Sequence, residues 1–125
     1  MFQVEADKSR NLLVMIFADR VVPAELAAAA DKVRSLLEGL TPGFRLLTDM
    51  SRLGWMDPAC VDNIQTNMDL LNQHGIAKVV RVIPDPKKDI GMNILSVFHY
   101  RRGVQITTCE TMAEAANLLA NLSHG

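Results

Sequence analysis

Cysteine is scarce in this chain: Cys60 and Cys109 are the two among 125 residues. They lie far apart in the sequence, and neither belongs to a CxxC pair or to a cluster of cysteines and histidines. Structural zinc sites are built from such clusters, so the sequence argues strongly against a metal site. We expect both cysteines to be reduced thiols of a cytoplasmic protein, with a disulfide as the lesser alternative.

The sequence also lacks long apolar runs and a strong excess of one charge. No run approaches the roughly 20 apolar residues that span a bilayer, so we expect no membrane span. The opening residues, MFQVEADKSRN, carry charges where an export signal would be apolar, which favours a cytoplasmic location. The formal net charge of −1 gives no support for binding to nucleic acid.

Glycine-rich binding motifs are missing as well. The seven glycines are scattered, and none of them completes a GxGxxG pattern or a phosphate-binding loop. We therefore expect no nucleotide cofactor, and no other cofactor is indicated.

Apolar patterning organises the chain into alternating strands and helices. Alternating or continuous apolar runs predict strands, and runs of strong helix formers with apolar residues at helical spacing predict helices. The expected strands are 2–6, 12–18, 44–50, 77–83 and 103–108, and the expected helices are 24–40, 58–74, 87–100 and one that begins after Thr111. This order predicts a single α/β domain, residues 1–125, with a five-stranded, mostly parallel mixed sheet, an N-terminal hairpin and four helices.

The segment TDMSRLGWMDPAC, residues 48–60, is the most informative local motif. We expect a loop between a strand end at Asp49 and a helix start at Asp57. Together with the element order, this segment resembles the STAS domains, the family of anti-sigma-factor antagonists and sulfate-transporter-associated domains, and above all its SpoIIAA-like group. In the phosphorylated antagonists the loop reads approximately Asp-x-Ser, a spacer, then Asp-Ser-Ser-Gly, and the serine after the second aspartate accepts a phosphate.

One departure from that pattern removes the usual switch. Asp49, Ser51 and Asp57 match, but the acceptor position holds Pro58, which has no hydroxyl group. Ser51 is then the one loop hydroxyl that could accept a phosphate, because Thr48 lies inside the expected strand. The resemblance still implies a scaffold that binds partners near this loop.

The candidate binding residues of the loop are Asp49, Ser51, Trp55 and Asp57, and each has a structural alternative. Asp57 before Pro58 is a strong helix-capping pair, and Asp49 could order the loop through backbone N–H groups. Trp55 could contact a partner or pack over the following helix. No histidine lies near Ser51 in the sequence, so we expect no catalytic site and no enzyme.

Two further candidates lie late in the chain. Lys87 and Lys88 stand near a helix start and form a candidate anion patch, with a solvated surface as the alternative. The helix expected at 87–100 is too apolar for a single buried stripe, which predicts a homodimer anchored by Phe98 and Tyr100.

The leading interpretation is a non-catalytic binding or regulatory module of SpoIIAA-like type that acts through a protein partner. The alternative is a protein that binds a small apolar ligand or a lipid, because SpoIIAA-like sheets resemble those of Sec14-type carriers. In that case a pocket would be lined by flexible side chains, with Met50, Met56, Met92 and Phe98 as candidates.

Overall fold

The computed structural model describes residues 1–83, 100 and 102–122. Its strands are β1 (Phe2–Asp7), β2 (Leu12–Val21), β3 (Arg45–Met56), β4 (Lys78–Val82) and β5 (Gln105–Cys109). Its helices are α1 (Pro23–Glu38), α2 (Val61–Gln73) and α3 (Met112–Leu122), with short 3-10 turns η1 (Lys8–Arg10) and η2 (Pro58–Cys60). The helix expected at 87–100 lies outside the described residues. No helix in the described part of the chain is long and apolar enough to cross a membrane.

The five strands form one sheet in the order β1-β2-β3-β4-β5. β1 and β2 pair as the antiparallel hairpin that the sequence predicts, with Phe2 opposite Phe17 and Asp7 opposite Leu12. The pairs β2–β3, β3–β4 and β4–β5 are all parallel. The helices α1 and α2 make the crossovers from β2 to β3 and from β3 to β4, because parallel neighbours cannot be joined by a tight turn. The predicted α/β class and mixed five-stranded sheet are confirmed.

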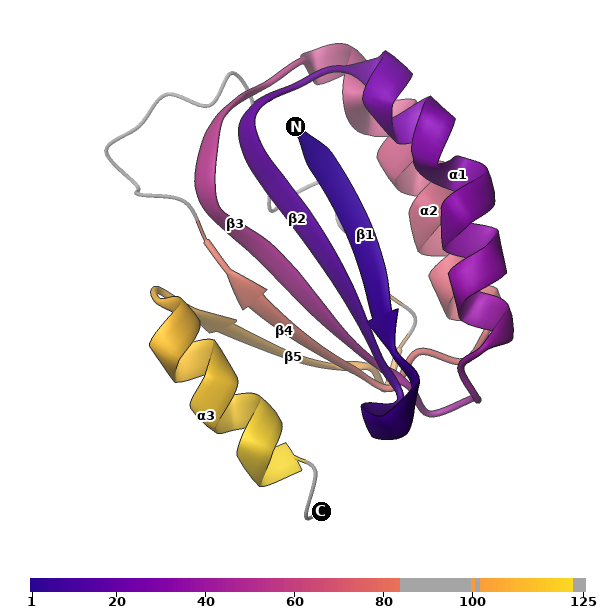
Figure 1. Cartoon of the computed structure of the whole chain (residues 1–125), viewed down its shortest axis with the longest axis vertical. Coiled ribbons are helices and arrows are strands. Elements are labelled where there is room, and N and C mark those ends of the chain that lie inside the picture. Colours follow the sequence, from indigo (N-terminus) through magenta and orange to yellow (C-terminus); the bar gives the residue numbers. More distant parts are fainter. Residues whose placement is uncertain (84–99, 101, 123–125) are drawn as a thin grey trace.

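Helices lie on both faces of the sheet (Figure 1). The larger core lies between the sheet and the α1–α2 pair, and its most buried members include Leu26, Phe44 and Ile64. The smaller core lies under α3, where Ala115 and Leu119 pack against Leu47 and Val80. A three-layer arrangement follows, with two helices on one face and α3 on the other face.

The prediction of a loop between Asp49 and Asp57 is wrong, because β3 continues through Met56. Two β-bulges in β3 explain the error. Between the pairs Ile16–Asp49 and Ala18–Arg52, β3 uses one residue more than β2. The same happens between Asp19–Leu53 and Arg20–Trp55. Each extra residue bends the strand and changes which face the next side chains occupy, so the sequence loses its strand-like alternation.

The bulged end of β3 pairs with β2 alone, because β4 stops opposite Asp49. We call residues 18–21 of β2 and 52–56 of β3 the β2–β3 extension. Gly54 allows the two backbones to approach closely, since a Cβ atom there would lie 3.1 Å from the Asp19 carbonyl oxygen. Asp19 itself adopts a positive φ of 55°. The extension is thus a strongly twisted two-stranded ribbon at the carboxyl end of the sheet.

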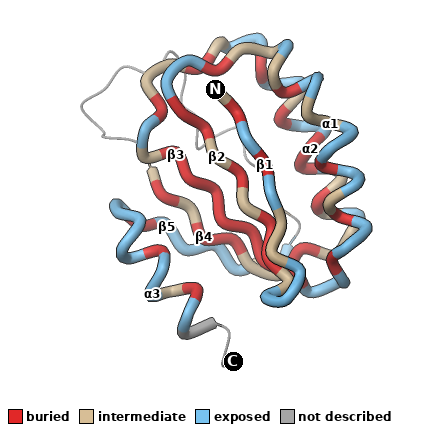
Figure 2. The backbone as a smooth tube through the Cα atoms, in the orientation of Figure 1, coloured by how far each residue is buried: buried red, intermediate tan, exposed pale blue. Residues whose placement is uncertain are grey.

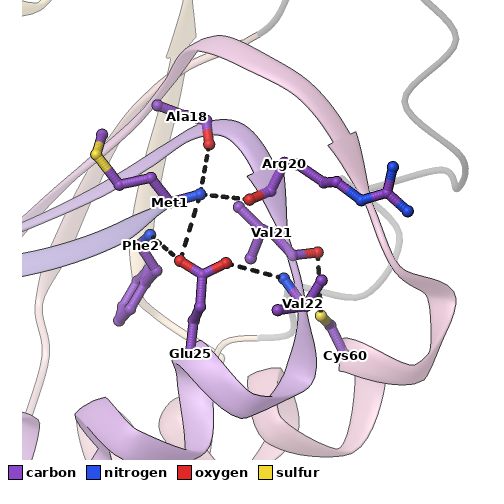
Figure 3. A network of polar contacts seen from close by, with 8 residues as sticks. All are labelled: Met1, Phe2, Ala18, Arg20, Val21, Val22, Glu25 and Cys60. Atoms are coloured by element: carbon purple, nitrogen blue, oxygen red, sulfur yellow. Dashed lines mark hydrogen bonds and ion pairs between the residues drawn. The ribbon is translucent and has the colours of Figure 1, made fainter.

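Glu25 ties the extension to the start of the chain (Figure 3). Its carboxylate accepts hydrogen bonds from the backbone N–H groups of Phe2, at 3.0 Å, and Val22, at 3.3 Å. It also forms an ion pair with the Met1 ammonium group at 3.3 Å. That ammonium group in turn donates to the carbonyl oxygens of Ala18 and Arg20. One carboxylate therefore links β1, α1 and the extension.

Candidate functional site

Asp49 and Ser51 form a local hydrogen-bonded unit at the first bulge. The Asp49 carboxylate accepts from the Ser51 hydroxyl group at 2.6 Å and from the Ser51 backbone N–H at 3.0 Å. Asp49 is buried, with 8% of its surface exposed. A short polar side chain that bonds the backbone two residues on is a turn-stabilising device. Asp49 therefore orders the backbone as the structural alternative predicts, although in a bulged strand and not in a loop.

Thr48 lies inside β3, as the sequence predicts, with 1% of its surface exposed. Ser51 is half-buried at the point where the strand bends. Of these two hydroxyl groups, only that of Ser51 is near solvent.

Asp57 caps the start of the next helical segment. Its carboxylate accepts from the Ala59 backbone N–H at 2.9 Å, and Pro58 occupies the first position of η2, which leads directly into α2. Proline is well suited there because its missing N–H would have no partner in the helix. The capping role that the sequence predicts is confirmed.

We expect Asp57→Ala to lower the free energy of unfolding by about 0.5–2 kcal/mol, the usual cost of losing an N-cap. Equilibrium denaturation should show a lower midpoint with an unchanged slope, because the surface exposed on unfolding stays the same. Asp57→Asn is the matched control, since its amide oxygen can still accept the bond. A midpoint unchanged in Asp57→Ala would contradict the capping role.

Trp55 lies in the β2–β3 extension and is half-buried. The Arg20 guanidinium carbon lies 4.3 Å from the centre of the indole ring, within the range of a cation–π contact. Arg20 and Arg52 are exposed. We call Arg20, Arg52 and Trp55 the extension surface. It combines an aromatic side chain in contact with Arg20 and a second exposed guanidinium group, that of Arg52, on the same two-stranded ribbon.

The described residues hold no convergent catalytic set around Ser51. Asp49 and Asp57 each serve the backbone next to them. His74, the only histidine among the described residues, lies at the end of α2, where Nε2 is 2.8 Å from the Leu40 carbonyl oxygen. Its ring packs edge-on against Phe44. The described part of the chain contains no cluster of three metal-ligating side chains.

Cys60 and Cys109 are free thiols buried in the protein. Burial raises the pKa of both thiols, and Asp57 and Glu114 add to the effect at Cys60 and Cys109 respectively. The thiolate form is thereby disfavoured, so neither is an activated nucleophile. Both behave as small core residues.

Several candidates from the sequence fall elsewhere. Lys87, Lys88, Met92 and Phe98 lie outside the described residues. Tyr100 packs against the larger core, and burial raises the pKa of its hydroxyl group. Met50 and Met56 are fully buried in the same core and do not line the cavity beside α3. A pocket formed by these methionines together with Met92 and Phe98 stays a prediction.

Two features have no signature in the sequence. The first is a cavity of about 380 Å³ between α3 and the β1–β2 side of the sheet. The second is Arg45, buried with 8% of its surface exposed at the start of β3. The cavity depends on how α3 is placed over the sheet, and sequence periodicity does not give that placement.

Comparison with known proteins shows the fold. No known family description matches the sequence, and no curated protein matches it either. The structure is similar to the anti-sigma-factor antagonist SpoIIAA in its unphosphorylated form, with 19% identity, a TM-score of 0.64, and coverage of 96% of this chain and 98% of that one. The phosphorylated Bacillus cell-fate determinant SpoIIAA also has a TM-score of 0.64 and 19% identity, over 95% of this chain and 99% of that one.

An uncharacterised DUF3478 protein from Shewanella loihica with a SpoIIAA-like fold is similar as well. It shares 13% identity and a TM-score of 0.67, over 95% of this chain and 92% of that one. The chain described here therefore has the SpoIIAA-like fold.

Proposed function

We propose that this protein is a non-catalytic regulatory module that binds a protein partner through the extension surface of Arg20, Arg52 and Trp55. The observation that carries the proposal is the contact between the exposed Arg20 and the half-buried Trp55 on a bulged ribbon at the carboxyl end of a SpoIIAA-like sheet. Tryptophan and arginine are the residues most enriched among those that dominate binding energy at protein interfaces. A cytoplasmic location is part of the proposal.

The proposed binding differs from that of a phosphorylated antagonist. Pro58 stands at the acceptor position that the resemblance identifies, so no phosphate can be added there. A phosphate on Ser51 would displace the 2.6 Å hydrogen bond to Asp49 and place two negative groups together. We therefore infer that the partner is bound without a phosphate switch at residue 58, and that phosphorylation of Ser51 would disturb the end of β3.

Quantitative capture from an extract of the source organism tests the proposal. A partner retained by the unmodified protein should be lost with Trp55→Ala or Arg20→Ala. It should be kept with Arg34→Ala, which removes a guanidinium group on α1 whose partner is the exposed Asp31. With the purified partner, Trp55→Ala should weaken binding about tenfold or more, the effect of losing a central anchor. Equal binding by the three variants would contradict the extension surface.

Self-association through residues 87–100, with Phe98 and Tyr100 as anchors, stays a prediction. Light scattering should give a mass near twice that of the 13.8 kDa chain. A monomer at tens of micromolar would rule it out. A dimer that persists in Phe98→Glu would place the interface elsewhere.

A further inference from the structure

The cavity beside α3 is a slot with an apolar floor and an apolar helix wall, and Glu5, Asp7 and Arg10 also line it. α3 packs on β3, β4 and β5, which leaves the β1–β2 side of this sheet face uncovered (Figure 1). The slot occupies this uncovered region and has a volume of about 380 Å³, in the range of small-molecule sites. Three sheet residues form its floor and three helix residues form its wall: Leu12, Val14, Leu47, Met112, Ala116 and Leu119.

The helix wall is unusually apolar for an exposed helix. Glu114 is the only charged residue of α3, and much of the helix surface is exposed in Figure 2. Met112, with 41% of its surface exposed, and the exposed Ala116 both line the slot. Met112 and Leu119 are seven residues apart on the helix, so the wall is about 10 Å long. These dimensions suit a linear apolar chain.

Positive charge gathers at the Leu119 end of the slot. Arg45 is buried there and donates to the carbonyl oxygens of Leu119, at 3.0 Å, and Arg10, at 2.8 Å. Both of these residues line the slot. Among the described residues no carboxylate forms an ion pair with Arg45 or Arg10. Burial of a charge is costly, and here it lowers the pKa of Arg45; the charge of Arg10 lowers it further, and that of Asp7 partly opposes the effect.

Asp7 is the carboxylate nearest to this charge and offsets part of it. The Ser9 hydroxyl group, which donates to Asp7 at 2.6 Å, and the charge of Arg10 both lower the pKa of Asp7. One carboxylate therefore stands against the two guanidinium groups of Arg10 and Arg45. Glu5 is exposed and lies two residues earlier in β1, about 7 Å away from Asp7, toward the middle of the slot. The end near Arg10 is therefore the end suited to an anion.

We propose that this slot binds a small amphipathic carboxylate, with its anionic head at Arg10 and its apolar chain between α3 and the floor of Leu12, Val14 and Leu47. Arg10 supplies the direct charge-assisted hydrogen bonds to the carboxylate. The buried Arg45, which donates to the Arg10 carbonyl oxygen, adds to the positive potential at this end of the slot. Met112 is an adaptable side chain that can close over the far end of the chain. This site is independent of the extension surface, because it lies on a different part of the sheet.

Titration with sodium octanoate, followed by NMR of the methyl groups, tests the proposal. We expect saturable shifts at Leu12, Val14, Leu47 and Leu119, with a dissociation constant on the order of 1 mM, typical of so small a ligand. Octylammonium and octanol have the same chain without the negative charge, and each should bind several-fold more weakly. Equal binding of octylammonium would overturn the anionic specificity, and linear shifts without saturation would overturn the site.

Two pairs of variants separate the head and chain contacts. Arg10→Gln should weaken octanoate binding about fivefold, the effect of one exposed charge-assisted contact, whereas Arg34→Gln should not. Ala116→Trp should block the slot. Ala113 lies three residues earlier in α3 and does not line the slot, so Ala113→Trp should bind octanoate as the unmodified protein does. If Ala116→Trp still binds octanoate, the slot is not the site. Trp55→Ala should leave octanoate binding unchanged, so this test is separate from that of the extension surface.

Discussion

Replacing Arg45 with alanine is expected to lower the free energy of unfolding by about 2–4 kcal/mol. The side chain is buried, and its two hydrogen bonds join α3 to the start of β3 and to the turn after β1. Leu119 lies in the last turn of α3, where carbonyl oxygens have no partner within the helix. Alanine would leave the Leu119 and Arg10 carbonyls without these donors and would create a void under the helix.

Urea denaturation measures this effect, with Arg34→Ala as the control for loss of an exposed arginine. Arg45→Met separates packing from hydrogen bonding, because it keeps most of the volume and removes the charge. We expect an intermediate loss, since relief from burying a charge offsets part of the lost bonding. Relative to the unmodified protein, both variants should show a larger increase in the hydrogen-exchange rate in α3 than in α1. If Arg45→Ala is as stable as the unmodified protein, Arg45 does not hold α3 in place.

Local sequence patterns predicted most of the fold because each element has its own chemical signature. Thr111 followed by Glu114 is a capping-box pattern, and the Thr111 hydroxyl oxygen does accept from the Glu114 N–H at 3.1 Å. The unbroken apolar run 12–18 is typical of a strand covered on both faces, and β2 does lie between β1 and β3. Caps and apolar runs are read from neighbouring residues, so a single sequence suffices for them.

The end of β3 could not be predicted in this way because its structure depends on pairing with β2. Met50 and Leu53 both face the larger core although they are three residues apart, which a regular strand does not allow. The intervening bulge uses Ser51 and the Asp49 carboxylate, and the next one uses Gly54. Aspartate, serine and glycine are typical of loops, so the bulged strand has the composition of a loop. Trp55 is a candidate binding residue from the sequence alone, but its contact with Arg20 was not predicted because Arg20 comes from the neighbouring strand.

The α3 slot was missed for a related reason. Its floor residues are ordinary apolar strand positions, and its wall residues have ordinary helical spacing. Only the lateral placement of α3 on β3–β5 leaves the β1–β2 side open. The position of Arg45 at a strand start gave no sign that its side chain would be buried under a helix end.

Glu25→Ala is expected to destabilise the protein by about 2 kcal/mol and to disturb the extension surface. The carboxylate is a shared acceptor for the Phe2 and Val22 N–H groups and for the Met1 ammonium group. Its removal would release the first strand from α1, and the ammonium group would lose the anion that holds it against the Arg20 carbonyl (Figure 3). Since Arg20 stacks on Trp55, a local change in this network should reach the indole ring.

Two measurements on Glu25→Ala distinguish a general loss of stability from this local link. Denaturation gives the stability, with Glu38→Ala as the matched control because Glu38 is an exposed carboxylate at the other end of α1. Fluorescence in the absence of denaturant gives the local effect, because Trp55 is the only tryptophan. We expect a shifted Trp55 emission in Glu25→Ala and an unchanged one in Glu38→Ala. If Glu25→Ala is destabilised but its Trp55 emission is unaltered, Glu25 holds the first strand without positioning Arg20 on Trp55. The geometry of the extension surface would then be set by the two β-bulges alone.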